Sequence, residues 1–247
     1  MTERYPSDSD LISKLAAINP RTLNAGELPS ITRATRTSGP RLEQALVENG
    51  DKTLFYDNGH GSIIRYLVDI EKQGKLQLPI KILNLDFHAD IAPYTDEFVE
   101  HTASWQRFGV DHDMWDRDHC YQWQPPHSNC PPMKEFTPEK FITPKSTEDL
   151  GNVDFDVLSV DLDFMQSLDT PEIKQYLLLL RTLVKRANHV FVCSSSSWTI
   201  GKIDDVTIEQ AVATIQSAFK EEEEESSTDS YKESVRSSTQ RIVEENN

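Results

Sequence analysis

Short apolar runs alternate with longer segments of helical spacing through most of the sequence. Strands are predicted where apolar and β-branched residues follow one another, over residues 53–56, 80–85, 155–160 and 189–193. Helices are predicted where apolar residues recur every three or four positions, over residues 62–75, 95–108, 171–188 and 207–219. Thr170 is expected to be the N-cap of the third helix, because Pro171 follows it at the first helical position.

This order of strands and helices predicts an α/β fold. The strands are short and almost wholly apolar, which is typical of parallel strands that are covered on both faces. We therefore expect three layers, α/β/α, around a mostly parallel sheet.

The ordered pattern indicates one main domain over residues 51–219. Residues 1–50 are weakly patterned, and we expect them to form a partly irregular N-terminal arm. The aromatic and proline-rich stretch at about residues 109–150 is expected to be an irregular insertion in the main domain. Residues 220–247 contain a run of acids and few apolar residues, so an acidic disordered tail is predicted.

Charge and composition exclude several classes of partner. The 247 residues carry 41 acidic and 25 basic side chains, and the formal net charge is −16. Nucleic-acid binding requires a basic face, so we expect none. No apolar run approaches the ~20 residues that a membrane-spanning helix needs, and the polar first ten residues hold no signal-peptide core. Three cysteines make no disulfide framework, which favours a cytoplasmic location.

Polar side chains follow two of the predicted strands at the point where each strand ends. They are Asp86, His88, Asp90, Asp161 and Asp163. Because ligands bind at the carboxyl ends of parallel strands, we expect these side chains to converge at one edge of the sheet. His60 follows the strand over residues 53–56 and can reach the same edge.

Carboxylates at the end of a buried strand are costly unless they are paired or bind a cation. Four carboxylates and two imidazoles, with no thiolate among them, suit Mn²⁺ better than a structural Zn²⁺. Four aspartates are enough to bridge two ions, and such a pair activates water near neutral pH. The residues therefore indicate two Mn²⁺, while a surface turn or a helix cap is the alternative interpretation of each motif.

Three short motifs resemble those of the arginase (ureohydrolase) and arginase/deacetylase superfamily. Residues 86–90, Asp-Phe-His-Ala-Asp, resemble its D-x-H-x-D signature, and residues 159–163, Ser-Val-Asp-Leu-Asp, resemble its S-x-D-x-D signature. Residues 58–62, Asn-Gly-His-Gly-Ser, resemble the turn that supplies the first histidine. The three motifs occur in family order and indicate an arginase-like fold over roughly residues 53–215.

The resemblance implies two overlapping ligand sets. The first Mn²⁺ would be held by His60, Asp86, Asp90 and Asp161. The second would be held by Asp86, His88, Asp161 and Asp163. Asp86 and Asp161 would bridge the ions and act in catalysis, and His101 would protonate the leaving amine. The implied reaction is attack of activated water on a guanidinium carbon, which yields an amine and urea.

The sequence departs from arginases in its substrate-binding segments. Arginases bind the free amino acid with an Asn-x-His-Gly segment, and this chain has Glu-His-Thr-Ala-Ser in its place at residues 100–104. The acidic residue that contacts the guanidinium is not evident either. The chain looks more similar to the arginase-like branch that includes peptide arginases, which convert arginine side chains of ribosomally made precursor peptides to ornithine. An arginine-containing peptide is therefore the preferred substrate, and a small guanidino compound, free arginine or agmatine, is the alternative.

Two functions of other classes stay open. A deacetylase-type amidohydrolase would use a single Zn²⁺ on Asp86, His88 and Asp161, although such enzymes usually carry a pair of histidines where only His60 is present. A non-catalytic adaptor would keep the metal site without turnover. Metal stoichiometry separates the deacetylase from a two-manganese hydrolase, and turnover separates both from the adaptor. An oligomer is compatible with the sequence.

Overall fold

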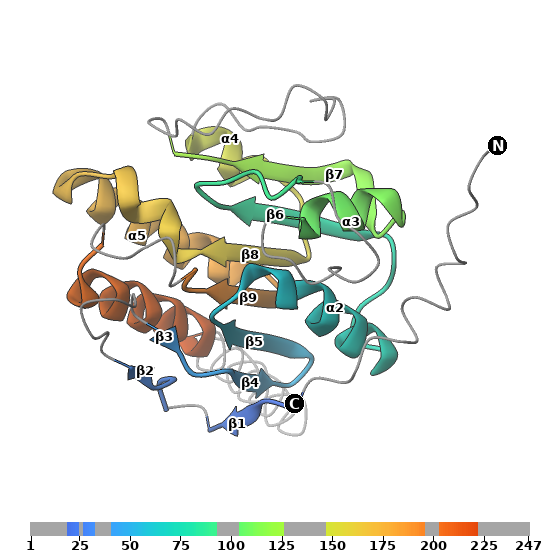
Figure 1. Ribbon diagram of the computed structural model, residues 1–247, viewed down its shortest axis with the longest axis horizontal. Coiled ribbons are helices and arrows are strands. Elements are labelled where there is room, and N and C mark those ends of the chain that lie inside the picture. Colours follow the sequence, from blue (N-terminus) through green and yellow to red (C-terminus); the bar gives the residue numbers. More distant parts are fainter. Residues whose placement is uncertain are drawn as a thin grey trace, which may run out of the picture.

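The computed structural model describes residues 19–24, 27–32, 41–92, 104–125, 147–195 and 203–221. Seven strands in this part of the chain form one sheet (Figure 1). From one edge to the other they are β1 (Arg21–Leu23), β4 (Ala45–Asn49), β5 (Lys52–Asp57), β9 (His189–Cys193), β8 (Val157–Asp161), β6 (Ile80–Leu85) and β7 (Trp115–Trp123). All neighbouring pairs are parallel except β4 and β5. The short strands β2 (Ile31–Thr32) and β3 (Arg41–Leu42) pair with each other.

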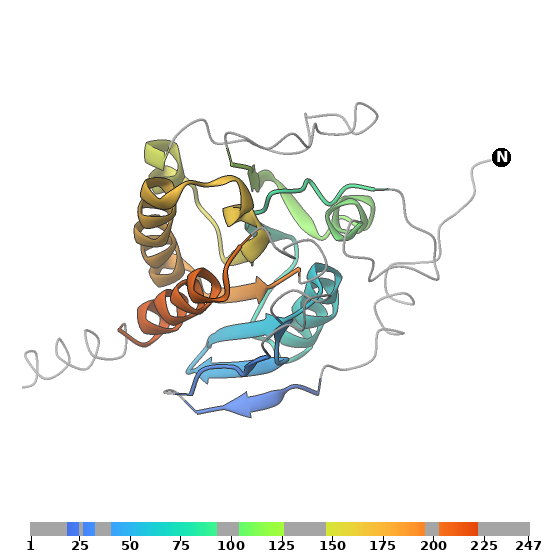
Figure 2. The same ribbon diagram turned by 60° about the vertical axis from the view of Figure 1, so that its left-hand side comes forward.

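Helices cover both faces of this sheet (Figures 1 and 2). Helices α2 (Ile63–Lys72) and α3 (Trp105–Asp111) pack on one face, and α5 (Thr170–Arg186) and the helix over residues 205–221 pack on the other. Strand β9 shows how one apolar run serves both faces: Val190 and Val192 join the core under α5, while Phe191 joins the core under α2. The prediction of a three-layer α/β/α fold with a mostly parallel sheet is confirmed.

The parallel register aligns the carboxyl ends of the central strands. Asp161 at the end of β8 pairs with Cys193 at the end of β9, and Cys193 pairs with Asp57 at the end of β5. Leu85, the last residue of β6, pairs with Val160. Short 3₁₀ helices follow two of these ends, η1 (His60–Ser62) after β5 and η3 (Leu162–Ser167) after β8. The residues just beyond these strands therefore meet at one edge of the sheet.

Two expectations about irregular segments were wrong in part. The insertion expected at about residues 109–150 includes β7 and the short helix α4 (Thr147–Asn152). The pattern of apolar residues does not predict β7, because the middle of this strand carries the exposed residues Arg117 and Asp118. It pairs with β6 alone at the edge of the sheet, where charged side chains are common.

The arm expected over residues 1–50 is also more regular than its composition indicates. Strands β1 and β4 belong to the main sheet, because β4 pairs antiparallel with β5 from Ala45 to Asn49. Residues 1–18 lie outside the described part of the chain.

Some expectations fall on residues that the structure does not describe. Helix α3 begins at Trp105, and residues 95–103 of the helix expected there lie outside the described ranges. The predicted acidic tail lies outside them from residue 222 onward, whereas residues 220 and 221 continue the last helix. No helix among the described residues is long and apolar enough to span a membrane.

The N-cap of α5 is Asp169 rather than the expected Thr170. The Asp169 carboxylate accepts a hydrogen bond from the Glu172 backbone N–H at 2.9 Å, and the Glu172 carboxylate accepts one from the Asp169 N–H at 2.8 Å. This reciprocal capping box satisfies two donors at the helix start. Thr170 becomes the first helical residue instead.

Replacing Asp169 with alanine is therefore expected to lower the free energy of unfolding by about 1 kcal/mol. The melting temperature should fall by about 2–4 °C for a domain of this size. Thr170→Ala is the matched control and should have a much smaller effect in the same thermal melts. A larger loss from Thr170→Ala than from Asp169→Ala would contradict this assignment of the cap.

Candidate metal centre

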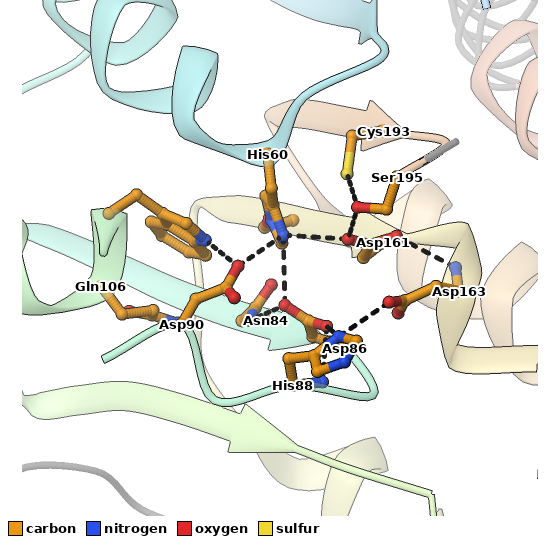
Figure 3. A network of polar contacts seen from close by, with 12 residues as sticks. His60, Asn84, Asp86, His88, Asp90, Gln106, Asp161, Asp163, Cys193 and Ser195 are labelled. Carbon is orange, nitrogen blue, oxygen red and sulfur yellow. Dashed lines mark hydrogen bonds and ion pairs between the residues drawn. The ribbon is translucent and has the colours of Figure 1, made fainter. Parts of the chain in front are cut away.

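The side chains predicted as metal ligands lie together at the carboxyl edge of the sheet (Figure 3). They are His60, Asp86, His88, Asp90, Asp161 and Asp163. His60 opens η1 after β5, residues 86–90 form the loop after β6, and the last two aspartates end β8 and enter η3. The structure thus brings together all six residues that the sequence singled out.

One group of carboxylates surrounds His60. The His60 Nδ1 atom lies 3.1 Å from Asp86 Oδ2, 3.1 Å from Asp90 Oδ2 and 3.4 Å from Asp161 Oδ2. The other ring nitrogen, Nε2, makes a 2.7 Å hydrogen bond with Ser159 Oγ. When Nε2 carries the proton and donates it to Ser159, the Nδ1 lone pair faces the carboxylates.

A second group lies around His88. The His88 Nδ1 atom is 2.8 Å from Asp163 Oδ2 and 3.9 Å from Asp86 Oδ1. Asp86 therefore presents Oδ2 to the His60 group and Oδ1 to the His88 group. A carboxylate placed in this way would be able to hold a cation in each group. Asp161 lies in the His60 group, and its role as a second bridge stays a prediction.

Local backbone contacts hold the two motifs in shape. Asp86 Oδ1 accepts the N–H of His88 at 2.8 Å, and Asp161 Oδ1 accepts the N–H of Asp163 at 3.0 Å. Asp163 Oδ1 in turn accepts the N–H of Phe87 at 3.3 Å, which ties the loop after β6 to the end of β8. The alternation of ligand and non-ligand residues in each motif follows from these turns.

A cation would fit between these groups, because buried atoms there face only titratable side chains. His60 Nδ1 is inaccessible to solvent and lies against three carboxylates, and the equally inaccessible Asp163 Oδ2 lies 2.8 Å from His88 Nδ1. Asp86, Asp161 and Asp163 are also buried almost completely. Even two protonated imidazoles would leave the four carboxylates with two uncompensated charges, and buried charge without compensation is strongly unfavourable. Divalent cations would supply the missing charge.

The pKa values of the carboxylates reflect the same crowding. Burial raises the pKa of Asp86 to about 7, and repulsion from Asp90 adds to this shift. Burial likewise raises the pKa of Asp163 to about 8, with added repulsion from Asp161. Without a cation, both side chains therefore resist ionisation near neutral pH.

Burial lowers the pKa values of the two imidazoles, but their neighbours outweigh this effect. Burial alone lowers the pKa of His88, but Asp163 outweighs it and raises the pKa to about 9. Burial also lowers the pKa of His60, and Cys193 together with the neighbouring carboxylates raises it well above the ordinary value. The site therefore holds protons where a metal centre would hold cations.

An outer layer of hydrogen bonds from α3 and β7 positions the ligands. Trp105 Nε1 donates to Asp90 Oδ2 at 2.7 Å, and the Trp105 ring centroid lies 4.6 Å from that of His60. Gln122 on β7 accepts from Asn84 Nδ2 at 2.9 Å and donates to the carbonyl of His88 at 3.1 Å. Such outer contacts orient metal ligands and tune their affinity.

Replacing Trp105 with phenylalanine should lower the affinity for one of the two ions about 10- to 100-fold, because Asp90 loses the hydrogen bond from the indole. Isothermal titration with Mn²⁺ should then resolve one weakened and one unchanged site. Trp115→Phe is the matched control, since the Trp115 indole donates to the backbone carbonyl of Gln106 and to no ligand. An equal loss of Mn²⁺ affinity in both variants would contradict the role given to Trp105. Unchanged Mn²⁺ affinity at both sites of Trp105→Phe would also contradict it.

Other candidate residues have mixed outcomes. His101, the proposed proton donor, lies outside the described residues. The sequence also places His119 and Cys120 near His127 and Cys130, but Cys120 is buried in β7 and His119 contacts Asp116 at 3.2 Å. His127 and Cys130 lie outside the described residues.

Cys193, which the sequence did not single out, is also a neighbour of the site, and Ser195 lies there with it. Ser195 Oγ donates to Asp161 Oδ2, and Cys193 lies beside His60 and Asp161. Both follow from the position of β9 next to β8, which the linear sequence does not reveal. The signal that could have found them is the end of a third apolar strand at Cys193.

Comparison of the chain with protein-family models and with curated proteins finds no match. Among solved structures, Trypanosoma cruzi formiminoglutamase with Mn²⁺ is similar, with a TM-score of 0.51 and 9% identity over 66% of this chain and 63% of that chain. Proclavaminate amidino hydrolase from Streptomyces clavuligerus has a TM-score of 0.45 and 16% identity over 67% of this chain and 62% of its own. Helicobacter pylori arginase has a TM-score of 0.41 and 18% identity over 72% of this chain and 73% of its own.

The chain spans less than two thirds of the length of the first two of these proteins. At these identities the likeness concerns the fold, and the formiminoglutamase comparison carries it. The described residues have an α/β fold similar to that of the formiminoglutamase, which agrees with the arginase-like fold that the motifs predicted.

Proposed function

We propose that this chain is a metal-dependent hydrolase that uses two Mn²⁺ to cleave a guanidino group into an amine and urea. The single observation that carries the proposal is the position of Asp86, whose two carboxylate oxygens face two separate ligand groups. Two bound Mn²⁺ would supply a water activated near neutral pH and positive charge that polarises the substrate.

The residues of the chain have distinct tasks in this proposal. His60, Asp90 and Asp161 would hold the ion on one side, and His88 and Asp163 would hold the ion on the other. Asp86 would serve both sides. All of these side chains except the partly exposed His88 are buried, and burial strengthens their electrostatic interactions.

We propose arginine within a peptide as the substrate and peptidyl ornithine as the product. The support for this choice is in the sequence, which has Glu-His-Thr-Ala-Ser at residues 100–104 in place of the Asn-x-His-Gly segment that binds the free amino acid in arginases. A substrate embedded in a peptide has no free amino-acid group at that position. The net charge of −16 also suits a cationic arginine-bearing peptide.

The zinc-deacetylase alternative is less well supported. A single Zn²⁺ on Asp86, His88 and Asp161 would leave His60 and Asp90 without a role. His60 is wholly buried and faces three carboxylates, which is a costly arrangement for a residue outside the site.

Mass spectrometry of substrates incubated with the manganese-loaded protein tests the proposal. The panel comprises free arginine, agmatine, N-formiminoglutamate and blocked peptides that each contain one arginine. We expect peptide products with the mass of ornithine in place of arginine, together with urea. Turnover of free arginine or agmatine alone would overturn the peptide substrate. No turnover by a protein that binds two ions would overturn the hydrolase and favour a binding role.

His101 provides a separate test of the chemistry, because we propose that it protonates the leaving amine. His101→Asn should lower kcat about 10²- to 10⁴-fold, the usual range for loss of a general acid. Binding of both ions should be unchanged in the same variant, as measured by metal analysis after dialysis. Unchanged kcat would show that another group donates the proton.

A further inference from the structure

One half of the candidate metal centre lies beside a buried thiol, that of Cys193. This residue ends β9 and pairs in parallel register with Asp161. Its sulfur, a ring nitrogen of His60 and a carboxylate oxygen of Asp161 all lie within 4.8 Å of one another. All three side chains are buried, and Figure 3 shows them around the same point. The function proposed above does not use the thiol.

The surroundings of Cys193 are those of a ligand rather than of a core residue alone. Its sulfur contacts Ser195 Oγ at 3.5 Å, a weak hydrogen bond, and Ser195 Oγ donates to Asp161. His60 Nδ1 supplies an independent sign of a cation site, because it is wholly buried and faces oxygens of three carboxylates at 3.1, 3.1 and 3.4 Å. By contrast, the other described cysteine, Cys120, belongs to none of the groups of potential ligands in the described part of the chain.

The donor atoms on the two sides have different chemical preferences. The His88 side offers one imidazole and carboxylates, a set that suits Mn²⁺. The His60 side adds sulfur to imidazole and carboxylate, and soft thiolate ligands favour Zn²⁺ over Mn²⁺.

We propose that Cys193 binds the cation on the His60 side directly. This half of the centre would then bind Zn²⁺ more tightly than Mn²⁺ when both are offered, whereas the manganese-loaded protein of the function proposed above would hold Mn²⁺ in both halves. Coordination breaks the S–H bond, its proton leaves to the buffer, and the sulfur electron pair forms the bond to the metal. The inference rests on the two-ion centre proposed above and names the metal of one half.

Cobalt(II) titration of the metal-free protein tests this inference, because a sulfur–cobalt bond gives a near-ultraviolet charge-transfer band. The band should appear in the unmodified protein and in Cys120→Ser, and it should be absent in Cys193→Ser. Equilibrium dialysis of each sample gives the number of ions bound. Loss of an outer contact to a metal ligand lowers metal affinity about 10- to 100-fold. The Zn²⁺ affinity of the His60 side should fall by at least this factor in Cys193→Ser, while the Mn²⁺ affinity of the His88 side stays unchanged.

The outcomes separate this inference from the function on which it rests. Two bound Co²⁺ without the band in the unmodified protein would overturn thiolate coordination and leave the two-ion centre intact. The same holds if the band persists in Cys193→Ser. Failure to bind two ions would overturn both proposals. Cys193→Ala, with folding checked by circular dichroism, gives the same readouts if the serine variant does not fold.

Discussion

Replacing Asp86 with asparagine is expected to abolish hydrolysis and to remove both ions. Asp86 is the residue that faces both ligand groups, so its loss weakens each of them. We expect a fall in kcat/KM of at least about 1,000-fold, which corresponds to about 4 kcal/mol of transition-state stabilisation. Metal analysis after dialysis and the peptide assay described above measure the two effects.

The same variant should fold as well as the unmodified metal-free protein. Burial raises the pKa of Asp86 to about 7, which means that the fold disfavours its charge, and asparagine carries none. Asp154→Asn is the matched control, because Asp154 is exposed near the opposite ends of the strands and pairs with Lys81. Retention of two ions and of activity in Asp86→Asn would contradict the shared ligand.

The second large effect concerns stability and pH. The pKa values of Asp86 and Asp163 are raised, to about 7 and about 8, above the ordinary value of 3.8. Groups with raised pKa values in the folded state add stability below the unfolded pKa and lose it as the pH rises through the folded value. His88, raised from 6.5 to about 9, acts in the same direction. Contacts of Asp161 with His60 and Ser195 outweigh its burial and lower its pKa, so Asp161 opposes this trend. His189 opposes it as well, because burial lowers its pKa.

The metal-free protein should therefore lose stability as the pH rises from about 4 to about 8. Mn²⁺ should restore it most strongly at the upper end, because binding no longer has to displace protons. A concentration 100 times the Kd adds about 2.7 kcal/mol for each site. Thermal melts at about pH 5.5 and about pH 8, with and without Mn²⁺, measure the difference. A larger stabilisation by Mn²⁺ at the lower pH would contradict the assignment of these groups as ligands.

The sequence predicted those parts of the fold that depend on local pattern. The limits of β6 and β9 agree with the predicted residues 80–85 and 189–193, because both are mostly apolar runs whose residues are buried on two faces. The meeting of Asp86 and Asp161 was predictable for a different reason. Parallel strands place their carboxyl ends at one edge, whatever the order of the strands.

Other features depend on contacts between distant segments. Strand β7 is held by pairing with β6 and has little apolar pattern of its own. The hydrogen bond from Trp105 to Asp90 requires α3 to pack beside the loop that follows β6. Cys193 lies near the site because β9 is the neighbour of β8, and the order of strands in the sheet cannot be derived from the local sequence pattern. Residues of these kinds are found only when the fold is known.

The central claim is that six side chains form one site for two cations that share Asp86. Crystals of the metal-free protein soaked in Mn²⁺, measured at the manganese absorption edge, test it most directly. Two anomalous peaks are expected, one among His60, Asp90 and Asp161 and one beside His88 and Asp163, with Asp86 between them. A single peak, or two peaks that do not both contact Asp86, would contradict the claim.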